Sequence, residues 1–306
     1  MNQSGASSMV EHGLAMPVVA GSTPAPRSTR KPARPVLRYF GGKWELAPWV
    51  ISYFPAHHTY TEVFGGAGSV LFQKERAEVE IYNDLDSRLV NVMRHLQDEE
   101  ESRRLQRKLS LTPWSREEFE RACAVLDQPC NHSSDVLAWA TIVVSFQGHG
   151  SGGLRRELCC GWRAKDDGAN GHAAHAWVNY PREISAFCER LRGVVIEHRD
   201  ALEVLPVHDR RDALHYVDPP YVQSERKSKH RYTKDFDDAA HRELSKVLHK
   251  LKGAVVLSGY PSPFYDKLYR TWRREIRPHR SVMGGERTEC IWLNARAPAH
   301  SRNLFA

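Results

Sequence analysis

The sequence predicts an α/β protein in which a parallel sheet is interrupted by a mainly helical insertion, and three observations support this fold class. A glycine-rich turn at 64–68 follows an apolar run, as in nucleotide-binding folds. Residues 98–192 begin with helical rather than alternating apolar spacing. Buried strands return after residue 193, and one of them ends abruptly at two consecutive prolines, Pro219 and Pro220.

Composition sets the broad class of protein. The 306 residues, 41% hydrophobic and 26% charged, suffice for one large or two small globular domains. No apolar run approaches the roughly 20 residues of a membrane span, and no signal-peptide pattern is present. The six cysteines form no CxxC pair, so we expect a reducing, cytoplasmic setting. Most of the net charge of +7 lies in residues 193–306. This positive charge either keeps the protein soluble or binds a polyanionic partner.

The N-terminal part contains a tail and then a tight loop. Residues 1–34 are rich in Ser, Pro, Ala and Gly without an apolar period, which indicates a disordered tail. Order is expected from Val36, where two glycines after an aromatic pair suggest a tight loop before a helix over 44–54. Lys43 in this loop could meet an anion, although a surface lysine is the alternative.

The next unit predicts a site for an adenosine-bearing ligand. A strand from residue 60 leads into the turn at 64–68, and a helix is expected through Arg76. Glycines allow a ligand to approach the backbone closely, and a helix N-terminus favours a negative group. A strand over 79–83 then ends at Asp84, roughly 20 residues after Gly65, as expected of an acid that binds ribose hydroxyls. This order does not separate a nicotinamide cofactor from S-adenosylmethionine.

Helices follow this unit. We expect them over 87–97 with Asp86 as cap, 98–109, 115–126 with Ser115 as cap, and 134–146 with Ser134 as cap. Residues 147–180 lack a sustained apolar period and place arginines beside an aromatic ring, which suits phosphate and base contacts: Arg155, Arg156, Trp162 and Arg163. The spacing of Cys159, Cys160, His172 and His175 is poor for zinc, so no metal site is expected.

The α/β pattern resumes at residue 193. A strand ends at Asp200, which either faces the cofactor or caps the helix that starts at Ala201. The buried strand over 213–217 ends at Asp218, because the prolines that follow offer no N–H to a sheet. The chain thus leaves the sheet at the edge where α/β proteins bind ligands. Helices over 237–251 and 262–272 and strands over 254–260 and 289–294 complete the pattern.

The residues after this strand suit a flipped base. Asp218 and the Pro219 carbonyl can both accept hydrogen bonds from one –NH2 group, and the Tyr221 ring can stack on a heterocycle. The alternative is an ordinary strand exit in which Asp218 binds its own backbone. Basic residues follow that would hold flanking phosphates or form a solvated loop: Arg226, Lys227, Lys229, Arg231 and Lys234. A second basic cluster is either a DNA rim or a charged surface: Arg270, Arg273, Arg274, Arg277 and Arg280.

The sequence Asp218-Pro219-Pro220-Tyr221 resembles the catalytic motif of amino-methylating DNA methyltransferases. Its position after the turn at 64–68 resembles the D12-class (Dam-like) DNA adenine-N6 methyltransferase family. The resemblance implies a Rossmann-like S-adenosylmethionine-dependent methyltransferase sheet. It also implies four segments: a tail at 1–34, a catalytic domain at 35–97 and 193–296, an inserted target-recognition module at 98–192, and a tail at 297–306.

The resemblance also implies ligands and residue roles. We expect S-adenosylmethionine as cofactor, duplex DNA as partner, a monomer, and a restriction-modification or phage context. The catalytic residues would be Asp218, Pro219, Pro220 and Tyr221. The cofactor-binding residues would be Tyr39, Lys43, Glu62, Phe64, Gly65, Gly66, Ala67, Gly68, Asp84, Asp200 and Asp218. The DNA-binding residues would be Arg155, Arg156, Arg163, Arg226, Lys227, Lys229, Arg231 and Lys234.

The expected reaction is direct displacement at a sulfonium methyl carbon by adenine N6, without a metal or a covalent nucleophile. Hydrogen bonds from the amine to Asp218 and to the Pro219 carbonyl would stabilise positive charge that develops on the nitrogen. Three alternatives remain. They are methylation of another amine, such as cytosine N4 or an RNA base; a DNA-binding protein of this fold without activity; and a nicotinamide-dependent oxidoreductase.

Overall fold

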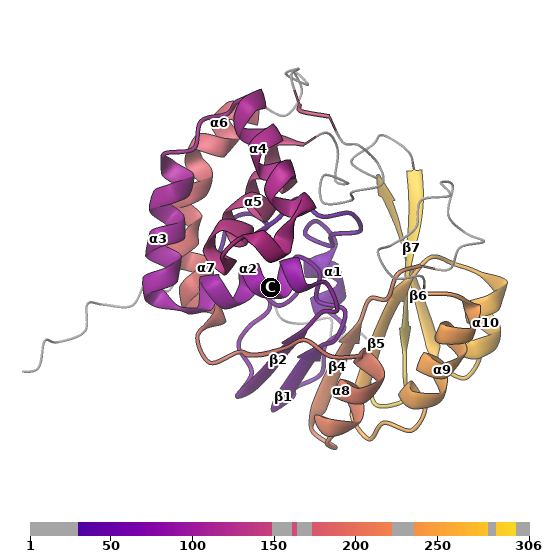
Figure 1. Cartoon of the computed structure of the whole chain (residues 1–306). Helices are drawn as coiled ribbons and strands as arrows, with labels where there is room; N and C mark the ends of the chain where they lie inside the picture. The colour runs from indigo at the N-terminus through magenta and orange to yellow at the C-terminus, as the bar shows by residue number, and fades with distance from the viewer. Residues whose placement is uncertain (1–29, 149–160, 164–172, 222–235, 281–285, 298–306) are drawn as a thin grey trace, which may run out of the picture.

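A seven-stranded sheet organises the part of the chain that the computed structural model describes, residues 30–148, 161–163, 173–221, 236–280 and 286–297 (Figure 1). Its strand order is β3-β2-β1-β4-β5-β7-β6. The strands are β1 (Thr59–Glu62), β2 (Val79–Asn83), β3 (Val195–Glu197), β4 (Ala213–Val217), β5 (Ala254–Gly259), β6 (Arg273–Arg280) and β7 (Glu286–Leu293). Strands β1 to β5 pair in parallel, and β7 pairs antiparallel to both β5 and β6.

The order of the strands brings two distant segments to one place. The chain runs outward from β1 to β2 and β3, then returns to β4 on the other side of β1. Such a reversal of strand order is where open α/β sheets bind ligands. Glu62, the last residue of β1, pairs with Tyr216 of β4, so these two strands end almost level. The glycine turn and Asp218 therefore leave the sheet side by side at its carboxyl edge.

Helices cover both faces of the sheet (Figure 1). One side carries α1 (Ala47–Ile51), α2 (Ser87–Gln97), α3 (Glu99–Ser110), α4 (Arg116–Asp127), α5 (Ser134–Gln147), α6 (Ala173–Asn179) and α7 (Ile184–Leu191). The other side carries α8 (Ala201–Val207), α9 (Asp238–Leu248) and α10 (Pro263–Leu268). Two apolar cores result, because alternate residues of each strand face opposite sides. Among the described helices, none is long and apolar enough to cross a membrane.

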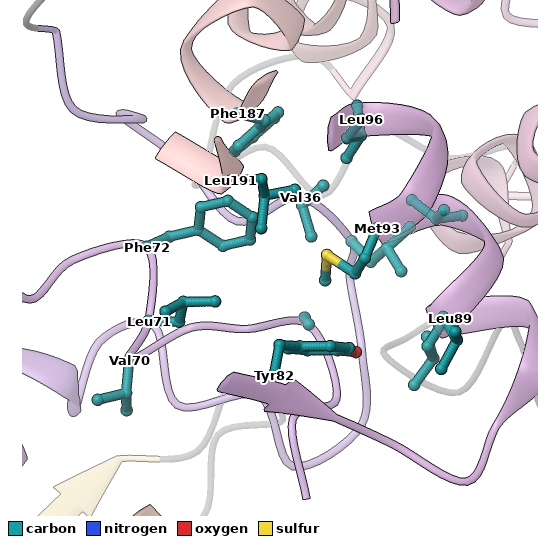
Figure 2. Packing of buried hydrophobic residues seen from close by; sticks show 14 of the residues in the cluster. Val36, Val70, Leu71, Phe72, Tyr82, Leu89, Met93, Leu96, Phe187 and Leu191 are labelled. Carbon is teal, nitrogen blue, oxygen red and sulfur yellow. The ribbon is translucent and has the colours of Figure 1, made fainter. Parts of the chain in front are cut away.

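The larger core joins the glycine turn to the helical insertion. Figure 2 shows Leu71 and Phe72, which follow the turn, packed among Tyr82 of β2, Met93 of α2 and Phe187 of α7. The Phe72 and Phe187 rings meet edge to face with centroids 5.2 Å apart. Aromatic pairs in this geometry add stability beyond the apolar area that they bury. Phe187 of the insertion thus packs directly against Phe72, which follows the turn.

Most predicted elements are confirmed, and their caps are largely as expected. Asp86 caps α2, and Ser115 caps α4 through a 3.1 Å bond from the Glu118 amide. The prediction of Ser134 as a cap is wrong, because Ser133 occupies the cap position of α5 and its side chain makes no capping bond there. Asp200 caps α8 by accepting the Leu202 amide at 2.8 Å.

One prediction of regular structure is wrong, and one strand was not predicted. The helix expected after the glycine turn, through Arg76, is a series of turns. The basic stretch over 273–280, which had no predicted structure, is strand β6. Arginine and proline give little strand signal, and this segment is ordered by pairing with β7 along its full length.

Residues 30–34, which composition places in the tail, contact the helical insertion. Glu183 accepts a bond from the Arg30 guanidinium and another, of 3.1 Å, from the Ala33 amide. Arg34 donates to the Ala176 carbonyl at 2.7 Å. The prediction of a disordered tail is therefore wrong for residues 30–34. Their contacts are polar, so they leave no apolar period in the sequence.

A buried ion cluster attaches α7 to the sheet. Glu80 of β2 accepts two bonds from Arg190 of α7, at 2.6 and 2.9 Å, and one from Lys74 at 2.6 Å. All three side chains are almost fully buried. Removing one member of a buried pair leaves the opposite charge without its partner, which is far more costly than losing a surface pair.

We therefore expect Arg190→Met to lower the free energy of unfolding by about 3 kcal/mol, since Glu80 would keep only Lys74 as a charged partner. Urea unfolding followed by circular dichroism measures this change. Arg103→Met is the matched control, because Arg103 is exposed and its ion pairs lie on the surface of α3. Equal stability of the two variants would contradict the structural role of the cluster.

Glu62 supports the glycine turn from inside the core. Its Oε2 accepts a 2.6 Å bond from the Tyr60 hydroxyl and a 2.9 Å bond from the Leu71 amide. Burial raises the pKa of Glu62 to about 8, although both bonds oppose the shift. The carboxyl is therefore largely protonated in the folded protein at neutral pH.

A pH dependence of stability follows from this shift. The folded state keeps a proton on Glu62 that the unfolded chain releases above pH 4.5, so this group's contribution to stability is lost as pH rises through about 8. Glu62→Gln retains an acceptor and cannot ionise, so stability should decline less, by on the order of a few kcal/mol, between pH 5 and 8. Urea unfolding at several pH values measures this, with the exposed Glu78→Gln as control. An unchanged slope in Glu62→Gln would refute it.

Candidate active site

Asp218 follows β4 directly and presents two different oxygen atoms. Its Oδ2 lies 3.0 Å from the Lys43 ammonium. Its Oδ1 is buried and has no hydrogen-bond partner among the described residues. Burial raises the pKa of Asp218. Lys43 opposes this shift, and so, to a smaller extent, does the nearby Tyr221 hydroxyl, whose own hydrogen bond goes to Glu289. A buried acceptor oxygen without a partner is expensive unless a ligand supplies the donor.

Lys43 comes from the tight loop that precedes α1. The Gly42 amide closes this loop on the Tyr39 carbonyl at 3.1 Å, and the Lys43 ammonium also donates to the Gly41 carbonyl at 3.1 Å. Lys43 is only 5% exposed, so the alternative of a surface lysine is wrong. Its ammonium also lies over the Tyr221 ring, 4.7 Å from the centroid. The loop thus delivers one buried cation to the Asp218 motif.

The loop at 39–43 faces the glycine turn at 65–69. A Cβ atom added to Gly66 would lie 3.4 Å from the Tyr39 ring, and one added to Gly42 would lie 3.9 Å from the Ser69 hydroxyl. The Ser69 hydroxyl is buried without a hydrogen-bond partner in the described part of the chain. Side chains at either glycine would fill the space between the two segments.

Gly65 has a different reason to be glycine. A Cβ atom there would lie 2.2 Å from the Tyr82 ring, which is closer than any real contact. The Tyr82 hydroxyl also donates to the Gly66 carbonyl at 2.7 Å. Gly65 is therefore required for packing of the turn on β2, whatever the turn binds.

Asp84 closes the turn from the end of β2. Its two oxygens accept the Gly66 and Asp86 amides, each at 2.8 Å. Burial raises the pKa of Asp84 to about 6, against the effect of these bonds. Each carboxylate oxygen can accept a second bond, so Asp84 still has capacity for hydroxyl donors.

Tyr221 is enclosed by three side chains. Its hydroxyl donates to Glu289 of β7 at 2.9 Å. Its ring meets Tyr260 at 4.4 Å between centroids, with the planes 73° apart. Together with Lys43 these contacts leave the residue 9% exposed. Neither Glu289 nor Tyr260 is among the site residues predicted from the sequence.

One signal could have found Glu289. It lies on the same face of β7 as Ile291 and Leu293, which are buried in the larger core. An acid that shares a strand face with two buried apolar residues needs a polar partner inside the protein. The sequence alone does not say which partner it has.

Of the remaining predicted residues, three make contacts of other kinds and the rest lie outside the described ranges. Asp200 is exposed and caps α8, so its assignment to the cofactor stays a prediction. Phe64 packs edge to face against Phe236 at 5.5 Å. Arg163 is half-buried, and its amide donates to the Gln147 carbonyl at 2.8 Å. The residues outside the described ranges are Arg155, Arg156, Arg226, Lys227, Lys229, Arg231 and Lys234, together with Cys159, Cys160 and His172.

The donors and acceptors suit an organic ligand with several polar groups. Around the facing loops the structure places unpartnered oxygens of Asp218 and Ser69 and the acid of Asp84. These atoms can accept bonds from amino and hydroxyl groups. In the described residues no group of three His, Cys, Asp or Glu side chains could hold a metal ion.

Comparison with known proteins identifies the family. A model of the D12 class N6 adenine-specific DNA methyltransferases matches residues 39–123 and 173–282, and no curated protein sequence matches the chain. The matched residues contain the loop with Lys43, the glycine turn and the Asp218 motif, and they exceed half of the chain. The chain therefore belongs to the D12 class of N6 adenine-specific DNA methyltransferases, enzymes that methylate adenine N6 in DNA.

Proposed function

We propose that this chain transfers a methyl group from S-adenosylmethionine to N6 of an adenine flipped out of duplex DNA at a specific sequence. One observation carries the assignment of the residues: the Asp218 carboxylate is held by Lys43 through one oxygen, while the other is buried without a partner. An adenine amino group is a donor of the kind that this oxygen lacks. The Pro219 carbonyl would accept the second hydrogen of the same amine.

The chemistry of the amine explains why an ionised acid is needed. The N6 lone pair is delocalised into the ring, so the nitrogen is a poor nucleophile. Hydrogen bonds to a carboxylate stabilise the positive charge that develops on nitrogen as it reacts, and such preorganised groups supply a large part of enzymatic rate. Burial disfavours the charged form of Asp218, and Lys43 favours it. Lys43 therefore keeps the acid in its active form.

The facing loops would hold the methyl donor. S-adenosylmethionine, when bound, supplies an electrophilic methyl group on a positively charged sulfur. Asp84 would accept bonds from ribose hydroxyls, and the glycine turn would allow close approach of the ligand. Tyr39 and Lys43 would line the opposite side. Glu62 would act through the turn, since its Oε2 is bonded to Tyr60 and Leu71 inside the core.

The proposal also assigns separate functions to different segments of the chain. We assign catalysis to residues 35–97 and 193–296 and target recognition to residues 98–192, in a monomeric enzyme. The basic residues that follow the Asp218 motif, at 226–234, and those in the insertion would hold the phosphates of duplex DNA, because Lys and Arg bind phosphate with release of counterions. Tyr221 would pack its ring against the flipped base.

A transfer assay tests this function. Purified protein is incubated with methyl-labelled S-adenosylmethionine and unmodified duplex DNA, and the DNA is hydrolysed to nucleosides. Label is expected in N6-methyladenine. Asp218→Asn should lower turnover at least 10²-fold, since it removes the charge that stabilises the reacting nitrogen, and DNA retention should persist. Asp212→Asn, at the exposed entrance to the same strand, is the matched control. Label in cytosine, or full turnover by Asp218→Asn, would overturn the proposal.

The ion pair gives a separate prediction about pH. Lys43→Met keeps the length of the side chain but removes its charge, so the pKa of Asp218 should rise further. More of the acid would then be protonated at any given pH. The acidic limb of the plot of log kcat/KM against pH should move to higher pH, with partial recovery of activity in alkaline buffer. A limb that stays in place would show that Lys43 does not set the ionisation of Asp218. Lys267→Met, an exposed lysine, controls for charge alone.

A further inference from the structure

The Tyr221 hydroxyl has a buried acid as its acceptor. It donates to Glu289 Oε2 at 2.9 Å, and Glu289 is 6% exposed. Burying a carboxylate is unfavourable unless polar groups compensate for the lost water. An apolar residue would suit packing better at this position, since Ile291 and Leu293 on the same strand face lie in the larger core. The bond from Tyr221 is thus a polar contact that compensates for burial of the acid.

Three chain segments meet around this bond at the carboxyl edge of the sheet. Glu289 precedes Cys290, which pairs with Gly259 at the end of β5. Tyr260 comes next in the chain and contacts the Tyr221 ring at 4.4 Å. The bond thus fixes the hydroxyl end of Tyr221 to β7, while Tyr260 supports the ring. Glu289 lies within the paired strand β7, and Tyr260 directly follows the paired strand β5.

The bond also bears on Asp218. Between Asp218 and Tyr221 lie only Pro219 and Pro220, whose φ angles are fixed by their rings. The four residues form a stiff segment that is held at one end by Lys43 and at the other by Glu289. Release of either end would let the Asp218 carboxylate turn relative to the strand.

We propose that Glu289 is a positioning residue that holds Tyr221, and through the two prolines Asp218, in the orientation that methyl transfer requires. This inference rests on the function proposed above. Misplacement of reacting groups by about 1 Å can reduce rate roughly 100-fold. Loss of the bond therefore acts on kcat, while DNA affinity, which comes from phosphate contacts elsewhere, changes little.

A double-mutant cycle on kcat tests the inference in the full-length protein. Glu289→Ala and Tyr221→Phe each remove one partner of the bond, and each is expected to lower kcat roughly 10- to 100-fold, with KM for DNA changed less than about threefold. The double variant should be no slower than the slower single variant, because both changes break one bond. Glu289→Gln keeps an acceptor for the hydroxyl and should recover most of the kcat lost in Glu289→Ala. Glu275→Ala, an acid on β6 paired with Arg273, is the control.

The outcomes separate this inference from the proposed function. Wild-type protein that transfers no label to DNA would overturn both. Active wild-type protein with unchanged kcat in Glu289→Ala would overturn this inference alone, and so would multiplicative losses in the double variant. Thermal unfolding of every variant gives a further readout. A fall in kcat for Glu289→Ala that only matches its loss of folded protein, without recovery in Glu289→Gln, would assign Glu289 to stability and refute the positioning role.

Discussion

The ion pair between Lys43 and Asp218 is the interaction on which the site depends. It joins the loop at 39–43 to the end of β4, and β4 lies beside β1, whose last residue, Glu62, pairs with Tyr216. The pair is nearly buried, so each charge needs the other. Because Lys43 occupies only Oδ2, the pair holds the carboxylate while leaving Oδ1 for a ligand. In the proposed function, one oxygen of this side chain thus serves for anchoring and the other for the substrate.

Three acids of the candidate site share one electrostatic property. Glu62, Asp84 and Asp218 all have pKa values raised mainly by burial, so the fold holds three acids partly against their preference for water. A cation bound among them would favour their ionised forms, and equally the ionised acids would favour the cation. Binding of a cation and ionisation of these acids are therefore coupled, and the methyl donor proposed above carries such a charge.

Sequence analysis could identify what is local. The apolar run over 213–217 followed by two prolines defines both a strand and its end, and the glycine turn with Asp84 defines a ligand-binding unit. Contacts between distant segments could not be predicted. The residues next to Lys43 give no sign that it pairs with Asp218, and those next to Tyr221 give no sign that it donates to Glu289. Strand β6 was missed because its order comes from β7 rather than from its own residues. The helix expected after the turn was wrong: these residues form turns, and three consecutive ones, Val70, Leu71 and Phe72, are buried in the larger core.

The segment that supplies Lys43 is itself held by the helical insertion. The Tyr180 hydroxyl donates to the Val36 carbonyl at 2.7 Å, and Ser145 of α5 bonds both the amide and the carbonyl of Arg38, at 2.7 and 3.1 Å. The loop with Lys43 starts one residue later. The insertion thus holds the backbone immediately before the loop that carries Lys43, and in this way it supports the ion pair. Glu289 of β7 contacts the Asp218 motif through Tyr221. The Asp218 motif is therefore supported from two directions, by helices between β2 and β3 through the segment that carries Lys43, and by β7 through Tyr221.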